Sequence, residues 1–132
     1  MFQTEPRIRG AAGASLPSDF ADEGEANMLQ IYPIILELLR ELRGVIAQIE
    51  RRDSDLTRQL RRCSSSIALN VGEGMYSRGK IRGARYHTAL ASARETLSCL
   101  EVARAMGYVA SLDAALVAKL NRVIGTLVRL VG

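Results

Sequence analysis

Apolar residues recur every three or four positions along most of the chain, the spacing that places them on one face of an α-helix. Four such stretches predict helices over residues 26–51, 55–73, 80–106 and 111–129. No stretch shows the alternation of β-branched residues that is typical of strands. Because the connections are short, the pattern predicts an all-α fold, an antiparallel up-down-up-down four-helix bundle over residues 26–132.

Each predicted helix carries one apolar stripe that would face the core. The four stripes are Met28, Tyr32, Ile35, Leu39, Leu42, Ile46 and Ile49; Leu56, Leu60, Cys63, Ile67 and Val71; Tyr86, Leu90, Ala93, Leu97 and Leu100; and Leu112, Leu116, Leu120, Val123, Leu127 and Leu130. Beside the third stripe runs a row of small residues, which would let a neighbouring helix approach closely. That row is Ala89, Ser92, Thr96, Cys99 and Ala103.

The first and fourth helices have a second apolar row, which widens their faces. These rows are Ile31, Ile34, Leu38 and Val45, and Val117, Ile124, Val128 and Val131. The extra area either closes the bundle tightly or is exposed for self-association. We favour a homo-oligomer, because the two wide faces lie on helices that are adjacent in an antiparallel bundle.

Several residues are typical of helix ends. Asp53 is a candidate amino-terminal cap of the second helix, and Ser111 of the fourth. Gly74 suits a left-handed carboxyl-terminal cap, and Gly107 should end the third helix. Pro33 should either kink the first helix or mark its first turn.

Residues 1–25 contain prolines and glycines without a helical period, so they predict a flexible tail. The chain is 48% hydrophobic but only 5% aromatic, with no Trp, which indicates an aliphatic core. Charges interrupt the apolar runs, so we expect no membrane-spanning helix. We also expect no secretory signal and therefore a cytoplasmic protein.

The net charge is +4, and the cations comprise 16 Arg and 2 Lys. Arginine matches phosphate geometry, so this bias favours a nucleic acid or another dense anionic partner, although a high-GC genome would produce the same bias. The predicted contact surface consists of Arg58, Arg61, Arg62, Arg78, Lys80, Arg82 and Arg85. The alternative is a solvated face with local ion pairs. No aromatic platform and no base-reading helix stand out, so the expected contact is to the phosphate backbone, RNA or DNA.

The stretch from residue 58 to 74 breaks ordinary helix rules, since it has three consecutive serines at 64–66. Those hydroxyls and the Asn70 amide could contact phosphates and sugars, or they could serve close helix packing. Glu73, at the unfavourable end of the helix dipole, would tie the turn to the next helix through a cation.

The residues that often carry catalysis or metal binding are few. An antiparallel register around the short turn places Asn70 near His87 and offsets Cys63 from Cys99 by about 7 Å, which argues against a disulfide. His87 has no catalytic partners in the sequence. We therefore expect a non-enzymatic protein with no metal and no cofactor.

Two runs, residues 56–74 and 84–109, resemble the four-helix-bundle proteins encoded in bacterial 23S rRNA intervening sequences. The shared pattern is an arginine pair, serines, Ile-Ala-x-Asn, Glu-Gly and then a helix with Ala-x-Ser-x-x-Glu. The matching residues are Arg61, Arg62, Ser64, Ser66, Ile67, Asn70, Glu73, Gly74, Ser92 and Glu95. The resemblance extends over about residues 28–130.

This resemblance implies a ring-like homo-oligomer, with a pentamer favoured. The family is similar in fold to the accessory variability determinant proteins of diversity-generating retroelements, which bind nucleic acid and a reverse transcriptase through a basic surface. It thus implies an accessory nucleic-acid-binding protein, or alternatively a scaffold for a protein partner such as a reverse transcriptase. The chain departs from the family pattern at Gly72 and in its long N-terminal stretch.

Overall fold

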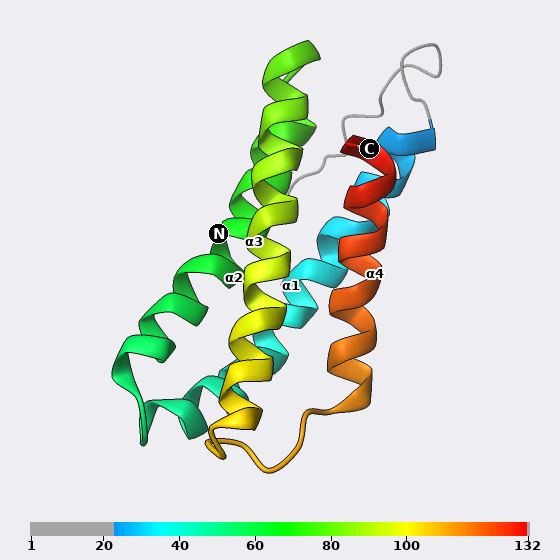
Figure 1. Ribbon diagram of the computed structural model, residues 1–132. Coiled ribbons are helices and arrows are strands. Elements are labelled where there is room, and N and C mark those ends of the chain that lie inside the picture. Colours follow the sequence, from blue (N-terminus) through cyan, green and yellow to red (C-terminus); the bar gives the residue numbers. More distant parts are fainter. Residues whose placement is uncertain (1–22, 132) are drawn as a thin grey trace.

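The computed structural model describes residues 23–131, which form four α-helices and, over that range, no β-strand (Figure 1). The helices are α1 (Glu23–Glu50), α2 (Ser54–Met75), α3 (Gly79–Ala105) and α4 (Ala114–Val131). The predicted all-α, four-helix fold is confirmed, and every helix end lies within three residues of its predicted position. The predicted tail lies outside the described residues except for 23–25, which belong to α1.

Consecutive helices pack against each other, and α4 also packs against α1, which closes a four-helix bundle (Figure 1). Tyr32, near the start of α1, lies over Gly72 near the end of α2. Arg61, near the start of α2, donates a hydrogen bond to Glu50 at the end of α1. These two helices are therefore antiparallel. The turn between α2 and α3 lies at the same end of the bundle as the start of α1 and the end of α4 (Figure 1).

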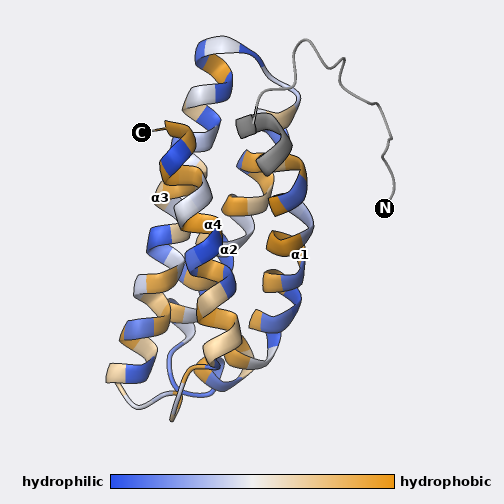
Figure 2. Cartoon of the chain, turned by 90° about the vertical axis from the view of Figure 1, so that its right-hand side faces the viewer, coloured by the Kyte–Doolittle hydropathy of each residue, from blue (hydrophilic) through white to orange (hydrophobic). Residues whose placement is uncertain are grey.

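Apolar side chains from all four helices form one core, and polar residues cover the outside (Figure 2). In α1 the fully buried residues include Ile31 and Leu38, whereas Tyr32 and Leu39 are only partly buried. The buried face is thus centred between the two predicted rows, because α1 contacts α2 on one side and α4 on the other. Each large aliphatic side chain buried in this core contributes about 1.5–3 kcal/mol.

Pro33 lies well inside α1 and is exposed. The predicted late start of the helix at Pro33 is therefore wrong. Proline cannot donate to the carbonyl one turn earlier, that of Leu29. Because both residues lie on the solvent side of α1, water can satisfy that carbonyl and the helix continues.

The amino-terminal caps of α2 and α4 are aspartates. Asp53 Oδ1 accepts a hydrogen bond of 2.9 Å from the Leu56 backbone nitrogen, which confirms the predicted cap. The predicted cap at Ser111 is wrong, because α4 begins three residues later. Asp113 Oδ1 there accepts from the Ala115 backbone nitrogen at 3.0 Å. Asp113 serves as the cap because its oxygen reaches the second residue of the helix.

Two glycines near helix ends have different roles. Gly107 has a φ of +77°, and the Tyr108 nitrogen donates to the Ala103 carbonyl at 2.9 Å, which confirms that α3 ends at a left-handed glycine. Gly74 lies inside α2 and is buried, so its predicted left-handed cap is wrong. A Cβ at this position would lie 2.3 Å from Tyr86 Cε1, so Gly74 provides room for the Tyr86 ring.

Candidate nucleic-acid interface

The pair α2 and α3, called here the α2–α3 hairpin, forms the most extensive helix contact among the described residues. The predicted row of small residues on α3 is buried there: Ala89, Ser92, Thr96, Cys99 and Ala103. Thr96 Oγ1 donates to Cys63 Sγ at 3.3 Å and to the Ser92 carbonyl at 2.8 Å. The small residues therefore let the two helices approach closely enough for direct polar contacts.

Ser66, Asn70 and Ser92 form a hydrogen-bonded group across the hairpin. Ser92 Oγ donates to Ser66 Oγ at 2.8 Å. Asn70 Nδ2 donates to the Ser66 carbonyl at 2.9 Å and to Ser66 Oγ at 3.0 Å. His87, the neighbour that the register predicted for Asn70, is exposed. These contacts favour packing over phosphate contact for Ser66 and Asn70.

The other two serines bond to the backbone of their own helix. Ser64 is buried and donates to the Leu60 carbonyl at 2.7 Å. Ser65 is exposed and donates to the Arg61 carbonyl at 2.7 Å. Such bonds to the preceding turn explain how a helix tolerates consecutive serines, since each hydroxyl is satisfied locally.

Cys63 and Cys99 are both buried and free. Burial raises the pKa of both thiols, that of Cys99 to about 12. Thiols that stay protonated are weak nucleophiles, so these two residues behave as small core side chains.

The seven cations predicted to form one contact surface lie in two groups. Arg58, Arg61 and Arg62 are in the first turns of α2. The second group lies in the turn between α2 and α3 and at the start of α3, and is called here the basic tip: Arg78, Lys80, Arg82 and Arg85. At 1.5 Å per residue, the length of α2 separates the two groups by about 20 Å. The seven cations thus lie at two levels of the hairpin.

Two of the three α2 arginines have acidic partners. Arg58 pairs with Asp55, and Arg61 Nη2 lies 3.3 Å from Glu50 Oε1. Arg62 is exposed and has no ion pair with any carboxylate of residues 28–131. This group thus partly matches the alternative of a solvated face with local ion pairs.

In the basic tip, two cations hold the turn in place. Arg85 Nε lies 3.1 Å from Glu73 Oε1, as expected if Glu73 ties the turn to α3. Arg82 Nε donates to the Gly74 carbonyl at 3.1 Å. Arg78 and Lys80 are exposed, and neither forms an ion pair with the carboxylates whose side chains the structure describes. Their charges are therefore available to a ligand.

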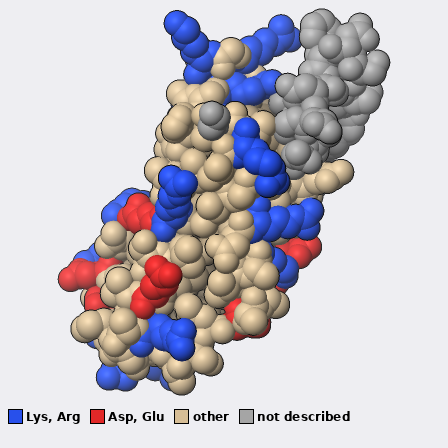
Figure 3. All heavy atoms as spheres, turned by 45° about the vertical axis from the view of Figure 1, so that its right-hand side comes forward, with Lys and Arg blue, Asp and Glu red and all other residues tan. Residues whose placement is uncertain are grey.

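Other features also make the tip positive. The first turn of α3 has no acidic residue, and Arg78 provides no side-chain cap, so the positive end of the helix dipole is not neutralised. From Glu73 to Arg85 the chain has four cations and one carboxylate, Glu73, a net charge of +3. On the face in Figure 3, basic side chains without acidic neighbours gather at the end that holds the tip.

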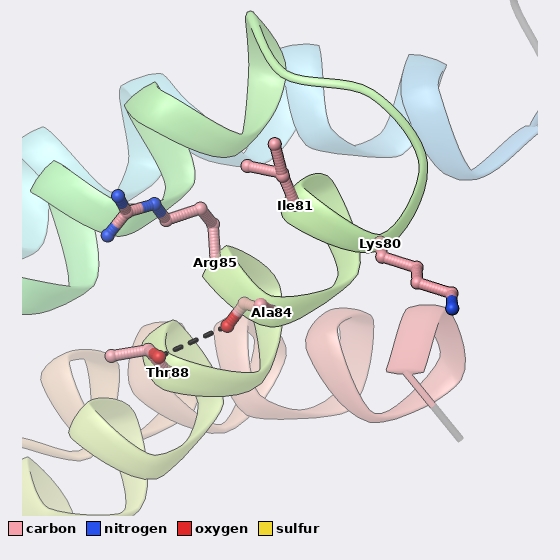
Figure 4. Close-up of a pocket in the computed structure, with 5 residues that line it drawn as sticks. All are labelled: Lys80, Ile81, Ala84, Arg85 and Thr88. Atoms are coloured by element: carbon pink, nitrogen blue, oxygen red, sulfur yellow. Dashed lines mark hydrogen bonds between the residues drawn. The ribbon is translucent and has the colours of Figure 1, made fainter.

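Sequence reasoning missed an exposed aromatic residue at this end. Tyr76, which ends α2, is 82% exposed, and Ile81 in α3 is 64% exposed. The sequence feature that could have identified Tyr76 is an aromatic residue outside the apolar stripe of α2, next to a turn rich in basic residues. The start of α3 carries a shallow hollow of about 280 Å³ (Figure 4). Its lining is Lys80, Ile81, Ala84, Arg85 and Thr88.

Glu95, the last residue of the predicted motif, accepts a hydrogen bond of 3.0 Å from Gln59 Nε2 across the hairpin. Within the described residues, no three His, Cys, Asp or Glu side chains come together in a way that could hold a metal ion. No helix over the same range is long and apolar enough to span a membrane.

Comparison with protein families gives a match over most of the chain. The family described as 23S rRNA-intervening sequence protein matches residues 27–129. That range includes all four helices from the first turns of α1 to the last turn of α4, and the whole of the α2–α3 hairpin. No curated protein and no solved structure gives a significant match.

Proposed function

Because the chain belongs to the 23S rRNA-intervening sequence protein family, we propose that it is a non-enzymatic, cytoplasmic accessory protein that binds nucleic acid, RNA or DNA, through the basic tip. The observation that carries the proposal is the pair Arg78 and Lys80. Both are exposed and lack an ion pair with the described carboxylates, in a stretch, residues 73–85, with a net charge of +3.

The proposed contact is made to phosphate groups. Arg78 binds phosphate oxygens through its planar fork and Lys80 acts as a point charge. Two contacts keep the turn in one conformation: the ion pair between Glu73 and Arg85, and the hydrogen bond from Arg82 to the Gly74 carbonyl. This limits the entropy cost of binding. Since the tip presents cations and no cluster of side-chain amides that could read bases, binding depends on the charge of the nucleic acid more than on its base sequence.

The test is fluorescence anisotropy with a labelled RNA and a labelled DNA over a series of salt concentrations. Arg78→Ala/Lys80→Ala should weaken binding and should reduce the slope of log K against log salt by about 0.7–0.9 for each phosphate group that the variant no longer binds. Arg43→Ala removes an exposed arginine of α1 and is the matched control. An affinity that does not respond to salt, or an equally weakened affinity in both variants, would overturn the proposal.

The same proposal includes assembly of an up-down-up-down bundle into a ring-like homo-oligomer, with a pentamer favoured. Apolar side chains that the bundle leaves exposed support it: Leu29 on α1 is 48% exposed and Val128 on α4 is 37% exposed. Ile34 and Ile124 on the same two helices are only partly buried. Light scattering tests the assembly, and a mass of 14.4 kDa at working concentration would exclude it.

A groove between α3 and α4 favours a second candidate function, that of a scaffold for a protein partner such as a reverse transcriptase. The groove has a volume of about 740 Å³ and lies towards the opposite end of α3 from the tip. Its lining is Leu97, Glu101, Arg104, Ala105, Leu112, Ala114, Val117, Ala118 and Asn121. A partner that co-purifies after nuclease treatment, and no longer does so when Ala118→Arg fills the groove, would support this role. Partner binding that needs intact nucleic acid would argue against it.

A further inference from the structure

Tyr76 is presented at the tip on a backbone that is held in place. Its nitrogen donates to the Glu73 carbonyl at 3.2 Å, and the Ser77 nitrogen donates to the Gly74 carbonyl at 3.1 Å. Ser77 Oγ also donates to the Glu73 carbonyl, at 2.8 Å. The ring itself is 82% exposed. An aromatic side chain with few rotatable bonds on a fixed backbone is a ready surface for a flat ligand.

The other described tyrosines are engaged with the protein. Tyr32 lies over Gly72, Tyr86 is buried in the core, and Tyr108 donates to Asp53 Oδ2 at 3.2 Å. Tyr76 thus differs from them in facing solvent.

The residues that follow Tyr76 in the chain include several cations. Arg78 follows it by two residues and Lys80 by four, and both charges are exposed. Arg85 is held by Glu73 on the next turns of α3. A ring beside exposed cations complements a ligand that combines flat bases with phosphates, which is the composition of a single strand of nucleic acid.

We propose that Tyr76 stacks on an unpaired base while Arg78 and Lys80 bind the neighbouring phosphates, so that the tip selects single-stranded or looped nucleic acid over duplex. This inference rests on the proposed function and specifies its ligand. In a duplex both faces of each base are already stacked, so the ring gains nothing there, whereas an unpaired base offers a free face. Stacking tolerates any base, which agrees with a tip that lacks base-reading amides.

Binding to an anionic membrane surface is the competing use of a tip with Tyr76, Ile81 and cations. Interfacial binding of that kind scales with the buried apolar area of an extended face. Here the apolar contribution is one tyrosine and one isoleucine, so the observations favour the single strand.

The experiment compares a labelled single-stranded RNA, a single-stranded DNA of equal length and the matching RNA duplex by fluorescence anisotropy. Tyr76→Ala should weaken binding to the single strands roughly 5- to 100-fold, and should leave the weaker duplex binding unchanged. Tyr76→Phe should keep most of the affinity, because it keeps the ring. Tyr76→Leu should behave like Tyr76→Ala, and Ile81→Ala is the matched control that removes exposed apolar area without an aromatic face.

A spectroscopic measurement tests stacking directly. The chain contains no Trp, so Tyr76→Trp introduces a single reporter at the tip. Its emission should be quenched when a single strand binds and should change little with duplex. Because the side chain is exposed, none of these variants should shift the thermal unfolding midpoint, which circular dichroism checks.

The outcomes separate this inference from the proposed function. If Arg78→Ala/Lys80→Ala weakens binding while Tyr76→Ala leaves single-strand affinity unchanged, the tip binds by charge alone and the stacking proposal fails. Equal affinity for strand and duplex would overturn it as well. If Tyr76→Ala and Ile81→Ala instead impair binding to anionic lipid vesicles and spare the strands, the tip is a membrane contact. Absence of any nucleic-acid binding would remove the proposed function itself.

Discussion

Gly72 and Gly74 lie two residues apart in α2, yet replacing each with alanine should affect the free energy of unfolding differently. At Gly74 a Cβ would lie 2.3 Å from Tyr86 Cε1 and 2.7 Å from Cδ1. The ring belongs to a residue that is only 3% exposed, so it cannot swing away without displacing other core side chains. At Gly72 the nearest atom is Tyr32 Cε1 at 3.6 Å, which is an ordinary contact distance.

The magnitudes follow from two opposing effects. Alanine stabilises a helix interior by up to about 1 kcal/mol relative to glycine, and both variants gain from this. Overpacking of a core costs about 1–3 kcal/mol, and only Gly74→Ala incurs this cost. Gly72→Ala should therefore be neutral or stabilising, and Gly74→Ala should be less stable than Gly72→Ala by about 1–3 kcal/mol.

Urea unfolding followed by circular dichroism measures the difference, at one protein concentration because assembly would shift the midpoint. Tyr86→Leu in the Gly74→Ala background should recover part of the stability, since it removes the ring that the new methyl group meets. If Gly74→Ala were as stable as Gly72→Ala, the close approach of the Tyr86 ring would not be the reason for a glycine at position 74.

Three further predictions concern other parts of the bundle. Asp53→Ala removes the cap bond to the Leu56 nitrogen and should lower the free energy of unfolding by about 1–2 kcal/mol in urea titrations, whereas Asp53→Asn should retain most of it. Because burial raises the pKa of Cys99 from 9.0 to about 12, the folded state keeps a proton that the unfolded chain loses. The contribution of this thiol to stability should thus be complete below pH 9 and fall towards pH 12, and Cys99→Ala should flatten that part of the profile; an unaltered profile would contradict the assignment. Lys119→Met removes the ion pairs that join α4 to two carboxylates of α1. It should lower the melting temperature at low salt but not at about 1 M salt, where charges are screened within about 3 Å, and a salt-independent effect would point to packing instead.

The helices and most of the core could be predicted from the sequence because they depend on local periodicity. Leu60, Cys63, Ile67 and Val71 follow one another at helical spacing in α2, and all four are buried. The small residues of α3 form an equally regular row. The pattern was less informative in α1, because it has two adjacent apolar rows and the buried face is centred between them.

Helix ends were harder to predict because several residues near each end suit a cap. Ser111 and Asp113 are both good cap residues, and only the geometry of the α4 start distinguishes them. Gly74 was misinterpreted for a related reason. A glycine near a helix end is explained equally well by a left-handed turn or by a neighbour that leaves no room for a Cβ, and the second explanation depends on Tyr86, a residue of another helix.

The candidate interface was predicted only in part, because ion pairs and exposure depend on the tertiary structure. The sequence identified every cation and the helix that separates the two groups, but it did not show which cations have carboxylate partners, as Arg58 and Arg61 do. The exposure of Tyr76 also required the structure, since an isolated aromatic residue in a turn can equally fold back onto the core.

The small side chains between α2 and α3 also affect the conformational entropy of folding. Alanine and glycine lose no side-chain rotamer freedom on burial, in contrast to the long side chains that lose most. The small side chains of the hairpin that carries the tip are therefore ordered at little entropic cost, but each also buries little apolar area. The hydrophobic stabilisation of the hairpin comes from the core that it shares with α1 and α4. The tip should accordingly unfold together with the whole bundle, as part of one cooperative unit.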